Sequence, residues 1–372
     1  MAQGTAISFA IATTEPASRP PPAPRSLPLR IQGALFSSAK DTVITLLLLA
    51  VLALALPPVI RWAIVDAVWY APGGAACRGI AGACWAVVPE KYRVILFGVY
   101  PYEEQWRPAL AAGLIIAMGL ASVVRHIPFK AKLIGWAATC VTTLILMSGG
   151  VFGLTPTGTD VWGGLPLTLI IFVGTVAGGL PLAVLLALGR RSKLAVVHTL
   201  CTAVIEVVRG IPLLAVLFVA ALIFPLFIPE RLTLDKLLRA EIGMIVFFAA
   251  YAAEIIRGGM QAISIGQYEA AEALGLRYWP RTWKIILPQA LSAVVPPLVS
   301  DMIRAFKNTS FVSILGLFDM LGATKAALED PAWVRYAPEA YIFVYLLYFC
   351  FCFVLSIYGR SVERRIASRD RR

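Results

Sequence analysis

The sequence predicts an all-α, polytopic membrane protein with about eight transmembrane helices. Hydrophobic residues make up 59% of the 372 residues and charged residues only 15%, which is less charge than a soluble domain of this length carries. Several apolar runs approach the roughly 20 residues that cross a bilayer as a helix. A transmembrane barrel would show alternating strands in place of these runs.

The start of the chain sets the topology. Residues 1–40 are rich in proline and have little apolar periodicity, so we expect a disordered N-terminal segment. The apolar run that begins at Val43 is long enough to span the bilayer and follows several basic residues. It is therefore interpreted as a first span and not as a signal peptide, with the N-terminus held in the cytoplasm.

The apolar runs give a map of spans. We expect them at about 43–66, 107–124, 132–152, 165–188, 205–229, 240–258, 291–323 and 339–359. Residues 41–152 thus hold three additional spans, with an extracytoplasmic loop at about 67–106. Basic residues gather in the short loops of one side and in the tail 361–372, which makes this side, with both termini, cytoplasmic. The net charge of +12 follows from this rule, and we predict no binding of nucleic acid.

The run 291–323 is too long for one straight helix. Pro296 and Pro297 lie early in it, and the polar segment 307–310 interrupts it. Broken helices occur at membrane depth where protein or a water-filled cavity covers the freed backbone, and in transporters they often mark the substrate path. The alternative is one tilted helix followed by a surface helix.

The segment 268–290 breaks the apolar rhythm of the chain. Good helix formers end at Gly275, where a helix C-terminus favours a residue at positive φ. Pro280 suits the first turn of a second helix, and Pro288 is expected to end that helix or to bend the chain into the next span. We therefore predict two short helices joined by a tight turn on the cytoplasmic side. Such a helical projection suits insertion into the groove of a partner.

This segment resembles the EAA loop of the permease subunits of ABC importers. The matching residues are Glu269, Ala270, Ala271, Gly275, Ile285, Leu287 and Pro288. An earlier element, residues 206–212, resembles the E-x-x-R-G-x-P element of the polar-amino-acid subgroup. The resemblance covers about residues 163–360, a five-helix permease core with its coupling loop at 264–290. The additional spans and the stretch Gly82–Trp85 resemble the M-type permease of the general L-amino-acid ABC importer of proteobacteria.

The resemblance implies a transport subunit of a bacterial inner membrane, not an enzyme. The implied partners are an ABC ATPase subunit that docks on the coupling loop, a periplasmic amino-acid-binding protein, and a second, homologous permease that makes a heterodimer. The chain has no phosphate-binding loop of the G-x-x-x-x-G-K-[ST] type. ATP and magnesium are therefore expected on the partner ATPase, with no cofactor bound by this chain.

Three charged residues, Asp301, Arg304 and Lys307, follow one another at helical spacing within an apolar run. Charges in a span usually face an interior or a cavity because a central charge costs about 2.5–3.5 kcal/mol on insertion scales. One interpretation is a polar substrate path that includes Asn308, Thr309 and Ser310. The other is a structural pair of Asp301 with Arg304.

Two further pairs have the same i, i+3 spacing. Glu254 and Arg257 precede the coupling loop, and Glu206 and Arg209 lie before Gly210 and Pro212. We expect both to be structural ion pairs near helix ends. Gly174 and Gly178 have the G-x-x-x-G spacing that allows close contact between helices.

The remaining reactive residues are few. No His/Cys cluster has metal-ligand spacing, so no metal site is predicted. Cys77 and Cys84 share one loop, and the sequence leaves open whether they form a disulfide, which an oxidising compartment permits. The chain offers no nucleophile–base pair for a membrane enzyme, and no catalytic residue is predicted. The alternative function is a secondary transporter or channel for small polar solutes that works alone, for which the coupling-loop motif would be coincidental.

Overall fold

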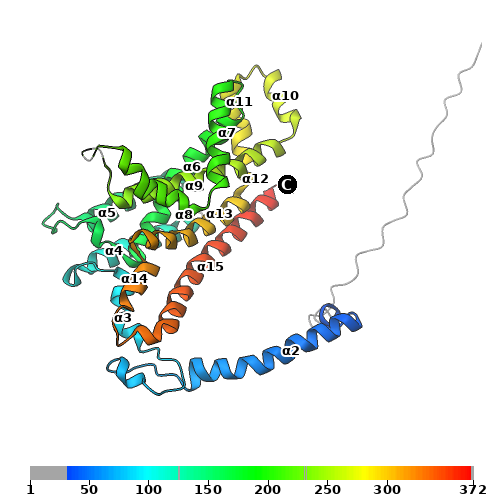
Figure 1. The fold of residues 1–372 in the computed structure, drawn as a ribbon. Helices are drawn as coiled ribbons and strands as arrows, with labels where there is room; N and C mark the ends of the chain where they lie inside the picture. Colours follow the sequence, from blue (N-terminus) through cyan, green and yellow to red (C-terminus); the bar gives the residue numbers. More distant parts are fainter. Residues whose placement is uncertain (1–31, 125, 230, 232, 370–372) are drawn as a thin grey trace, which may run out of the picture. The chain divides into compact units, whose positions relative to one another are not determined.

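The computed structural model describes residues 32–124, 126–229, 231 and 233–369. It divides the chain into two units, residues 1–65 and residues 66–372. Helices make up nearly all of the regular structure (Figure 1), which confirms the predicted all-α class. The disorder predicted for residues 1–40 falls mainly on residues 1–31, which lie outside the described residues.

The first unit contains one long helix, α2 (Ala39–Ile60), which continues through a π-helical turn, Arg61–Val65. Its N-terminus is capped by Ser38, whose hydroxyl accepts a hydrogen bond from the backbone N–H of Asp41 at 3.1 Å. None of the described residues of α2 is buried, and Leu54 is 78% exposed. A helix that is apolar on all sides suits lipid or a protein neighbour. It corresponds to the first predicted span.

Most spans of the second unit are single helices. They are α4 (Trp106–Val123), α5 (Phe129–Ser148), α6 (Gly164–Arg190), α9 (Lys236–Ala262) and α15 (Ala337–Arg369). With α2 they make six helices, among the described residues, that are long and apolar enough to cross a membrane, or up to eight if two bent pairs each count as one span. This agrees with the predicted number. Helix α15 extends beyond the predicted span 339–359 into the basic tail.

The first bent pair begins with α7 (Ala195–Gly210) and α8 (Leu213–Phe218), and the two arms of the pair meet at 112°. The break falls at Ile211 and Pro212, because proline at this position cannot continue the hydrogen-bonding pattern of α7. The prediction of one span at 205–229 was therefore wrong about its first part. That part belongs to α7, a separate arm that begins at Ala195.

The second bent pair confirms that 291–323 is not one straight helix. The helical segment that ends with α12 (Leu287–Ala293) meets α13 (Val295–Asn308) at a bend of 64°. A 3-10 helix, Thr309–Leu315, follows α13 directly. The chain then turns at Gly316, whose φ is +73°, passes the short strand β1 (Phe318–Asp319) and forms α14 (Met320–Ala327). The predicted end of this span at 323 was wrong, because α14 is a separate helix.

Helices α6 and α9 form the centre of the second unit. They approach closely at the two glycines of the G-x-x-x-G spacing. A Cβ atom at Gly174 would lie 2.5 Å from the carboxylate of Glu241, and one at Gly178 would lie 2.8 Å from the side chain of Ile245. The close helix contact that this spacing allows is thus present between α6 and α9.

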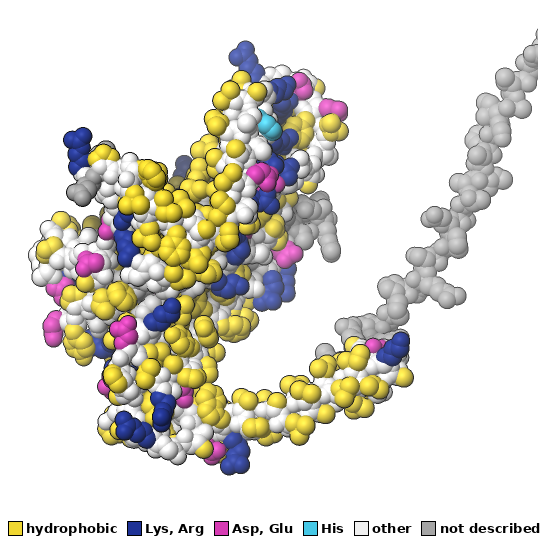
Figure 2. All heavy atoms as spheres, viewed as in Figure 1, with side chains coloured by type: hydrophobic (Ala, Val, Ile, Leu, Met, Phe, Trp, Pro, Cys, Tyr) yellow, Lys and Arg dark blue, Asp and Glu magenta, His cyan; other side chains and the backbone are white. Residues whose placement is uncertain are grey.

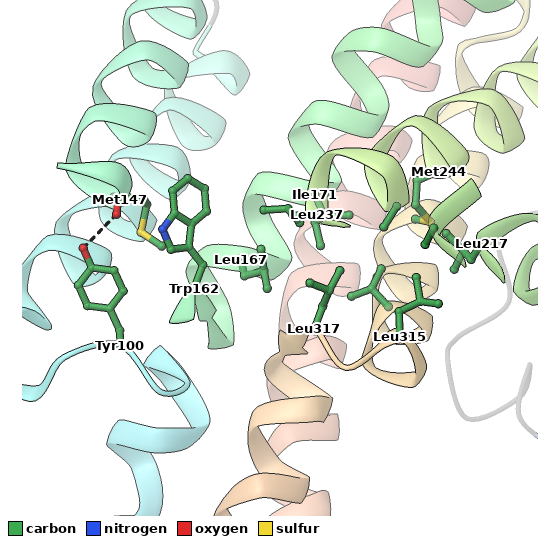
Figure 3. Close-up of a cluster of buried hydrophobic side chains, with 14 of the residues drawn as sticks. Tyr100, Met147, Trp162, Leu167, Ile171, Leu217, Leu237, Met244, Leu315 and Leu317 are labelled. Carbon is green, nitrogen blue, oxygen red and sulfur yellow. Dashed lines mark hydrogen bonds between the residues drawn. The ribbon is translucent and has the colours of Figure 1, made fainter. Parts of the chain in front are cut away.

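A buried apolar cluster ties α4 and α5 to this centre (Figure 3). Tyr100 donates a hydrogen bond from its hydroxyl to the carbonyl of Met147 at 3.1 Å, and both side chains belong to the cluster. The cluster continues through Trp162 and Leu167 to Met244 of α9. The additional helices α4 and α5 are therefore packed into the same core as the helices that follow them.

One end of the second unit is closed by residues 66–106 together with 316–340, which we name the stapled cap. Cys77 and Cys84 form a disulfide within it, which answers the question that the sequence left open. The backbone N–H of Cys84 donates to the buried carboxylate of Glu339 at 2.9 Å. The prediction of a loop at 67–106 was incomplete, because this segment also contains helix α3 (Val87–Phe97).

Candidate functional site

The loop at 264–290 has the predicted form of a helix, a turn and a second helix. Helix α10 (Ile265–Ala273) ends at Gly275, whose φ is +70°. The N–H of Leu276 donates to the carbonyl of Ala271 at 3.1 Å, and the N–H of Gly275 donates to that of Glu272 at 2.9 Å. These two bonds make a Schellman motif, which stops the helix and satisfies its last carbonyls.

The second half of the loop differs from the prediction. Helix α11 (Tyr278–Arg281) continues through a π-helical turn, Thr282–Ile286, into α12. Pro288 lies in the first turn of α12, where its missing N–H costs little. The expectation that Pro288 ends this helix or bends the chain was wrong. The bend lies further on, at Val294, which joins α12 to α13.

A few polar contacts hold the loop against the spans. Tyr268 donates from its hydroxyl to the carbonyl of Met260, at the end of α9, at 2.9 Å. The guanidinium of Arg191, just beyond α6, donates to the same hydroxyl at 3.1 Å. Arg281 pairs with Glu272 across the turn at 3.4 Å. Tyr268 thus joins α10 to the ends of both central helices.

The outer surface of the loop is left uncovered. Glu269 and Ala270 are exposed, while Ala271 is buried. Large apolar side chains are also exposed, with Leu274 at 77% and Trp279 at 58%. Basic side chains gather on this end of the molecule, around α7, α10 and α11 (Figure 2). An exposed surface of mixed apolar and charged residues is typical of a protein–protein contact.

The other matching residues of the loop support it from within. Leu287 is buried and Ile285 is half-buried, and both pack against the cluster that contains residues of α6 and α9. Pro288 is exposed. The structure therefore separates the predicted coupling residues into an outward group, Glu269 and Ala270, and an inward group, Ala271, Ile285 and Leu287, with Gly275 in the turn.

Glu254 of α9 is the centre of an ion network where α6, α7 and α9 come together. Arg257 donates to its carboxylate at 2.9 Å, as the i, i+3 spacing predicted. Arg190, the last residue of α6, donates to it at 2.6 Å and to Glu206 of α7 at 2.6 Å. Arg209 lies 3.9 Å from it. The expected pair of Glu206 with Arg209 was wrong, since each residue is paired with a residue outside α7.

A second polar group lies on α13. The side chain of Asp301 is almost completely buried and accepts a hydrogen bond from Nε of Arg304 at 2.8 Å. The guanidinium of Arg304 also lies over the ring of Tyr251 of α9, 4.1 Å from its centroid. Cation–π contact of this kind stabilises a charge that is partly removed from water. Asp301 and Arg304 therefore form the pair of the second interpretation, with Tyr251 as an aromatic partner; their role in a substrate path stays a prediction.

The remaining residues of the predicted path follow that pair at the end of α13 and in the 3-10 helix after it. Thr309 is completely buried, and its hydroxyl donates to the carbonyl of Phe306 at 2.8 Å. The hydroxyl of Ser310 donates to the carbonyl of Lys307 at 2.9 Å. Both hydroxyls are used at the end of α13, next to Asn308. Lys307 is exposed. Whether these residues line a path with Asp301 and Arg304 stays a prediction.

The structure gives contacts to three residues for which the sequence predicted none. Arg190 is one of the basic residues beside a span, and it holds two carboxylates. Tyr251 lies just upstream of the coupling loop, within the stretch that resembles the permease family, and Tyr268 is the first residue of the segment 268–290. The carboxylate partners of Arg190 and the arginines that contact Tyr251 lie at least 16 residues away in the sequence, so no local spacing could have indicated these contacts.

Comparison with known proteins agrees with this architecture. Residues 179–368 match the model of the family described as binding-protein-dependent transport system inner membrane component. The chain belongs to this family. It is also 41% identical over 341 residues, 90% of this chain and 92% of the relative, to the inner membrane amino-acid ABC transporter permease protein YhdY of Escherichia coli strain K12.

Two further similarities extend the comparison. The chain is 34% identical over 424 residues to the glutamate/glutamine/aspartate/asparagine transport system permease protein BztC of Rhodobacter capsulatus, covering 94% of this chain and 97% of the relative. A crystal structure of an amino acid ABC transporter with histidines is similar with 28% identity and a TM-score of 0.48, covering 54% of this chain and 90% of that chain. Family membership makes this chain a multi-pass transport component of an inner membrane, and the predicted family is confirmed.

Proposed function

We propose that this chain is a permease subunit of an ATP-driven, binding-protein-dependent importer of L-amino acids. Relatives that are similar over nearly the whole chain are named as amino-acid transport permeases. In the proposed mechanism, an ATPase subunit docks on the coupling loop, residues 264–290, and binds ATP with magnesium. Its closure moves the loop, and the loop moves the spans.

The observation that carries this proposal is the surface of the coupling loop. Tyr268 joins α10 to the ends of α6 and α9 and Ala271 is buried, while Glu269 and Leu274 remain exposed beside the Schellman turn. A loop that is firmly joined to the spans and uncovered on the outside can transmit a force from a partner. A transporter or channel that works alone has no use for such a surface.

The substrate path is proposed to run beside the pair of Asp301 and Arg304. A carboxylate and a guanidinium at one place complement the ammonium and carboxylate groups of an amino acid. We expect Arg304→Ala to lower uptake more strongly than it lowers the amount of assembled complex. Loss of the folded protein in this variant, measured by size-exclusion chromatography in detergent, would favour a purely structural role.

The other partners follow from the same proposal. A second, homologous permease completes the path as a heterodimer, and an amino-acid-binding protein delivers the substrate to the side of the stapled cap. Helix α6 begins at Gly164, beside the cap, and the residue after its end, Arg191, contacts Tyr268 of the coupling loop. With the loop facing the ATPase, the proposed topology has the cap outside the cytoplasm and both termini inside.

Affinity purification of the full chain from its native membrane in mild detergent tests the proposal. We expect an ATPase and a second permease to copurify with the wild type, and Gly275→Asp to lose the ATPase. Gly79→Asp is a matched control, because Gly79 has a φ of +82° and open space around it, as Gly275 has, but lies in the stapled cap. A wild-type chain that purifies alone, under conditions that preserve a known ABC importer, would favour the secondary transporter.

A further inference from the structure

A continuous series of contacts leads from the coupling loop to the pair of Asp301 and Arg304. It begins at Tyr268 of α10, which receives a hydrogen bond from Arg191. The preceding residue, Arg190, holds Glu254 at 2.6 Å. A displacement of α10 therefore acts on the end of α6 through Arg191, and on α9 both through the carbonyl of Met260 and through the pair of Arg190 with Glu254.

Arg209 is the next member of the series, and its contacts are incomplete. Its guanidinium lies 3.9 Å from Glu254, which is beyond hydrogen-bond distance. Its Nε is buried and has no hydrogen-bond partner among the described residues. A buried donor without a partner costs free energy, so a small movement that gives Arg209 a carboxylate oxygen is favourable. Arg209 lies in the last turn of α7, immediately before the bend of 112°.

Tyr251 connects Arg209 with Arg304. The guanidinium of Arg209 lies 5.6 Å from the centroid of the Tyr251 ring, and that of Arg304 lies 4.1 Å from the same centroid. The hydroxyl of Tyr251 also donates to the backbone carbonyl of Arg209 at 3.4 Å. Two arginines from different elements thus contact one aromatic ring. If one of them moves the ring of Tyr251, the cation–π contact of the other changes.

We propose that Arg209 is a positioning residue that transmits the movement of the coupling loop to Arg304. Movement of the loop shifts Arg190 and Glu254, and Arg209 turns its unused N–H groups onto the carboxylate of Glu254. The turn of Arg209 displaces the hydroxyl and ring of Tyr251, on which Arg304 rests. Arg304 then changes its position relative to Asp301. This inference rests on the proposed function.

The test measures coupling in the complete complex in proteoliposomes. Uptake of a radiolabelled mixture of L-amino acids and ATP hydrolysis are recorded together, with the binding protein loaded from the same mixture. We expect Arg209→Gln to retain stimulated hydrolysis and to lower uptake per ATP by roughly 2- to 30-fold, the range of coupling changes seen along such networks. An unchanged ratio of uptake to hydrolysis in Arg209→Gln would overturn the proposal.

A matched control and a double variant separate this role from a general effect. Arg239 of α9 also has a buried Nε without a partner among the described residues, but it contacts the carbonyl of Ala221 and lies outside the series. We expect Arg239→Gln to keep the wild-type ratio. The double variant Arg209→Gln, Arg304→Gln should have an uptake per ATP no lower than that of the worse single variant, because both residues act in one series. An uptake per ATP lowered by the product of the two single effects would contradict the proposal.

A second variant serves if Arg209→Gln does not assemble. Tyr251→Leu removes the shared ring and leaves both guanidinium groups in place. We expect the same loss of uptake per ATP, and a wild-type ratio in Tyr251→Leu would overturn the proposal. If the proposed function itself is wrong, the result is different: the loaded binding protein does not stimulate ATP hydrolysis in the wild-type complex.

Discussion

The two ends of the second unit are built on different principles. The stapled cap is held together by contacts within itself. A disulfide joins Cys77 to Cys84, and the backbone N–H of Cys84 donates to the buried carboxylate of Glu339. Tyr336 adds a hydrogen bond from its hydroxyl to the carbonyl of Gly74 at 3.0 Å. In the coupling loop, Tyr268 makes the main polar contacts with the spans and Leu274 is exposed.

The two ends differ in which contacts hold their structure. The cap encloses its own apolar cluster, which includes Trp333 and Val87. The coupling loop has a fixed backbone turn at Gly275 but an uncovered outer face. A cap held by its own contacts suits a fixed docking platform, whereas an anchored but open loop suits a part that moves with a partner.

Removal of the disulfide is expected to have the largest effect on the difference between the cap and the coupling loop. We expect the double variant Cys77→Ser, Cys84→Ser to lower the free energy of unfolding of the cap by about 2.5 kcal/mol, because the bond closes a short loop in the unfolded chain. Limited proteolysis of the purified protein measures the effect, with cleavage expected in the cap and not in the coupling loop. Equal resistance of the wild type and the variant would show that the other contacts hold the cap without the bond.

A change of backbone conformation at Gly275 tests the other end. Its φ of +70° is strained for a residue with a branched side chain. We expect Gly275→Val to cost roughly 1–2 kcal/mol in the turn and to lower uptake about tenfold, measured in proteoliposomes. Gly275→Asn is the matched control, because asparagine tolerates positive φ, and it should keep most of the uptake. If both variants behaved alike, the side chain and not the turn would be the cause.

The sequence predicted the features that depend on neighbouring residues. Gly275 was recognised because it follows a run of helix formers, and the break near Pro296 because proline ends the preceding hydrogen-bonding pattern. The pair of Asp301 with Arg304 followed from its spacing. Contacts between distant elements could not be predicted in this way. Glu206 pairs with Arg190 of another helix, and helix α3 is too short and polar to appear as a span.

The smallest expected effect concerns one partly buried ion pair of the cap. Lys91 donates a hydrogen bond to Asp330 at 2.8 Å and thereby lowers the pKa of this carboxyl below its ordinary value of 3.8. A lowered pKa in the folded state means that the pair stabilises the cap above pH 3.8, and that this contribution is lost as the pH falls further, through the lowered pKa. Lys91→Gln should therefore reduce the thermal stability of the cap slightly at neutral pH.

The pH dependence distinguishes this contact from the rest of the cap. The difference in melting temperature between Lys91→Gln and the wild type should shrink as the pH falls below 3.8, and it should also shrink at high salt, because salt screens a pair that is partly open to solvent. Asp330→Asn should behave in the same way, although it also changes the acceptor for the N–H of Ala332. If the difference in melting temperature persisted in acid and in high salt, Lys91 would contribute through packing of its alkyl chain. Apolar contact, and not the ion pair, would then stabilise the cap at this position.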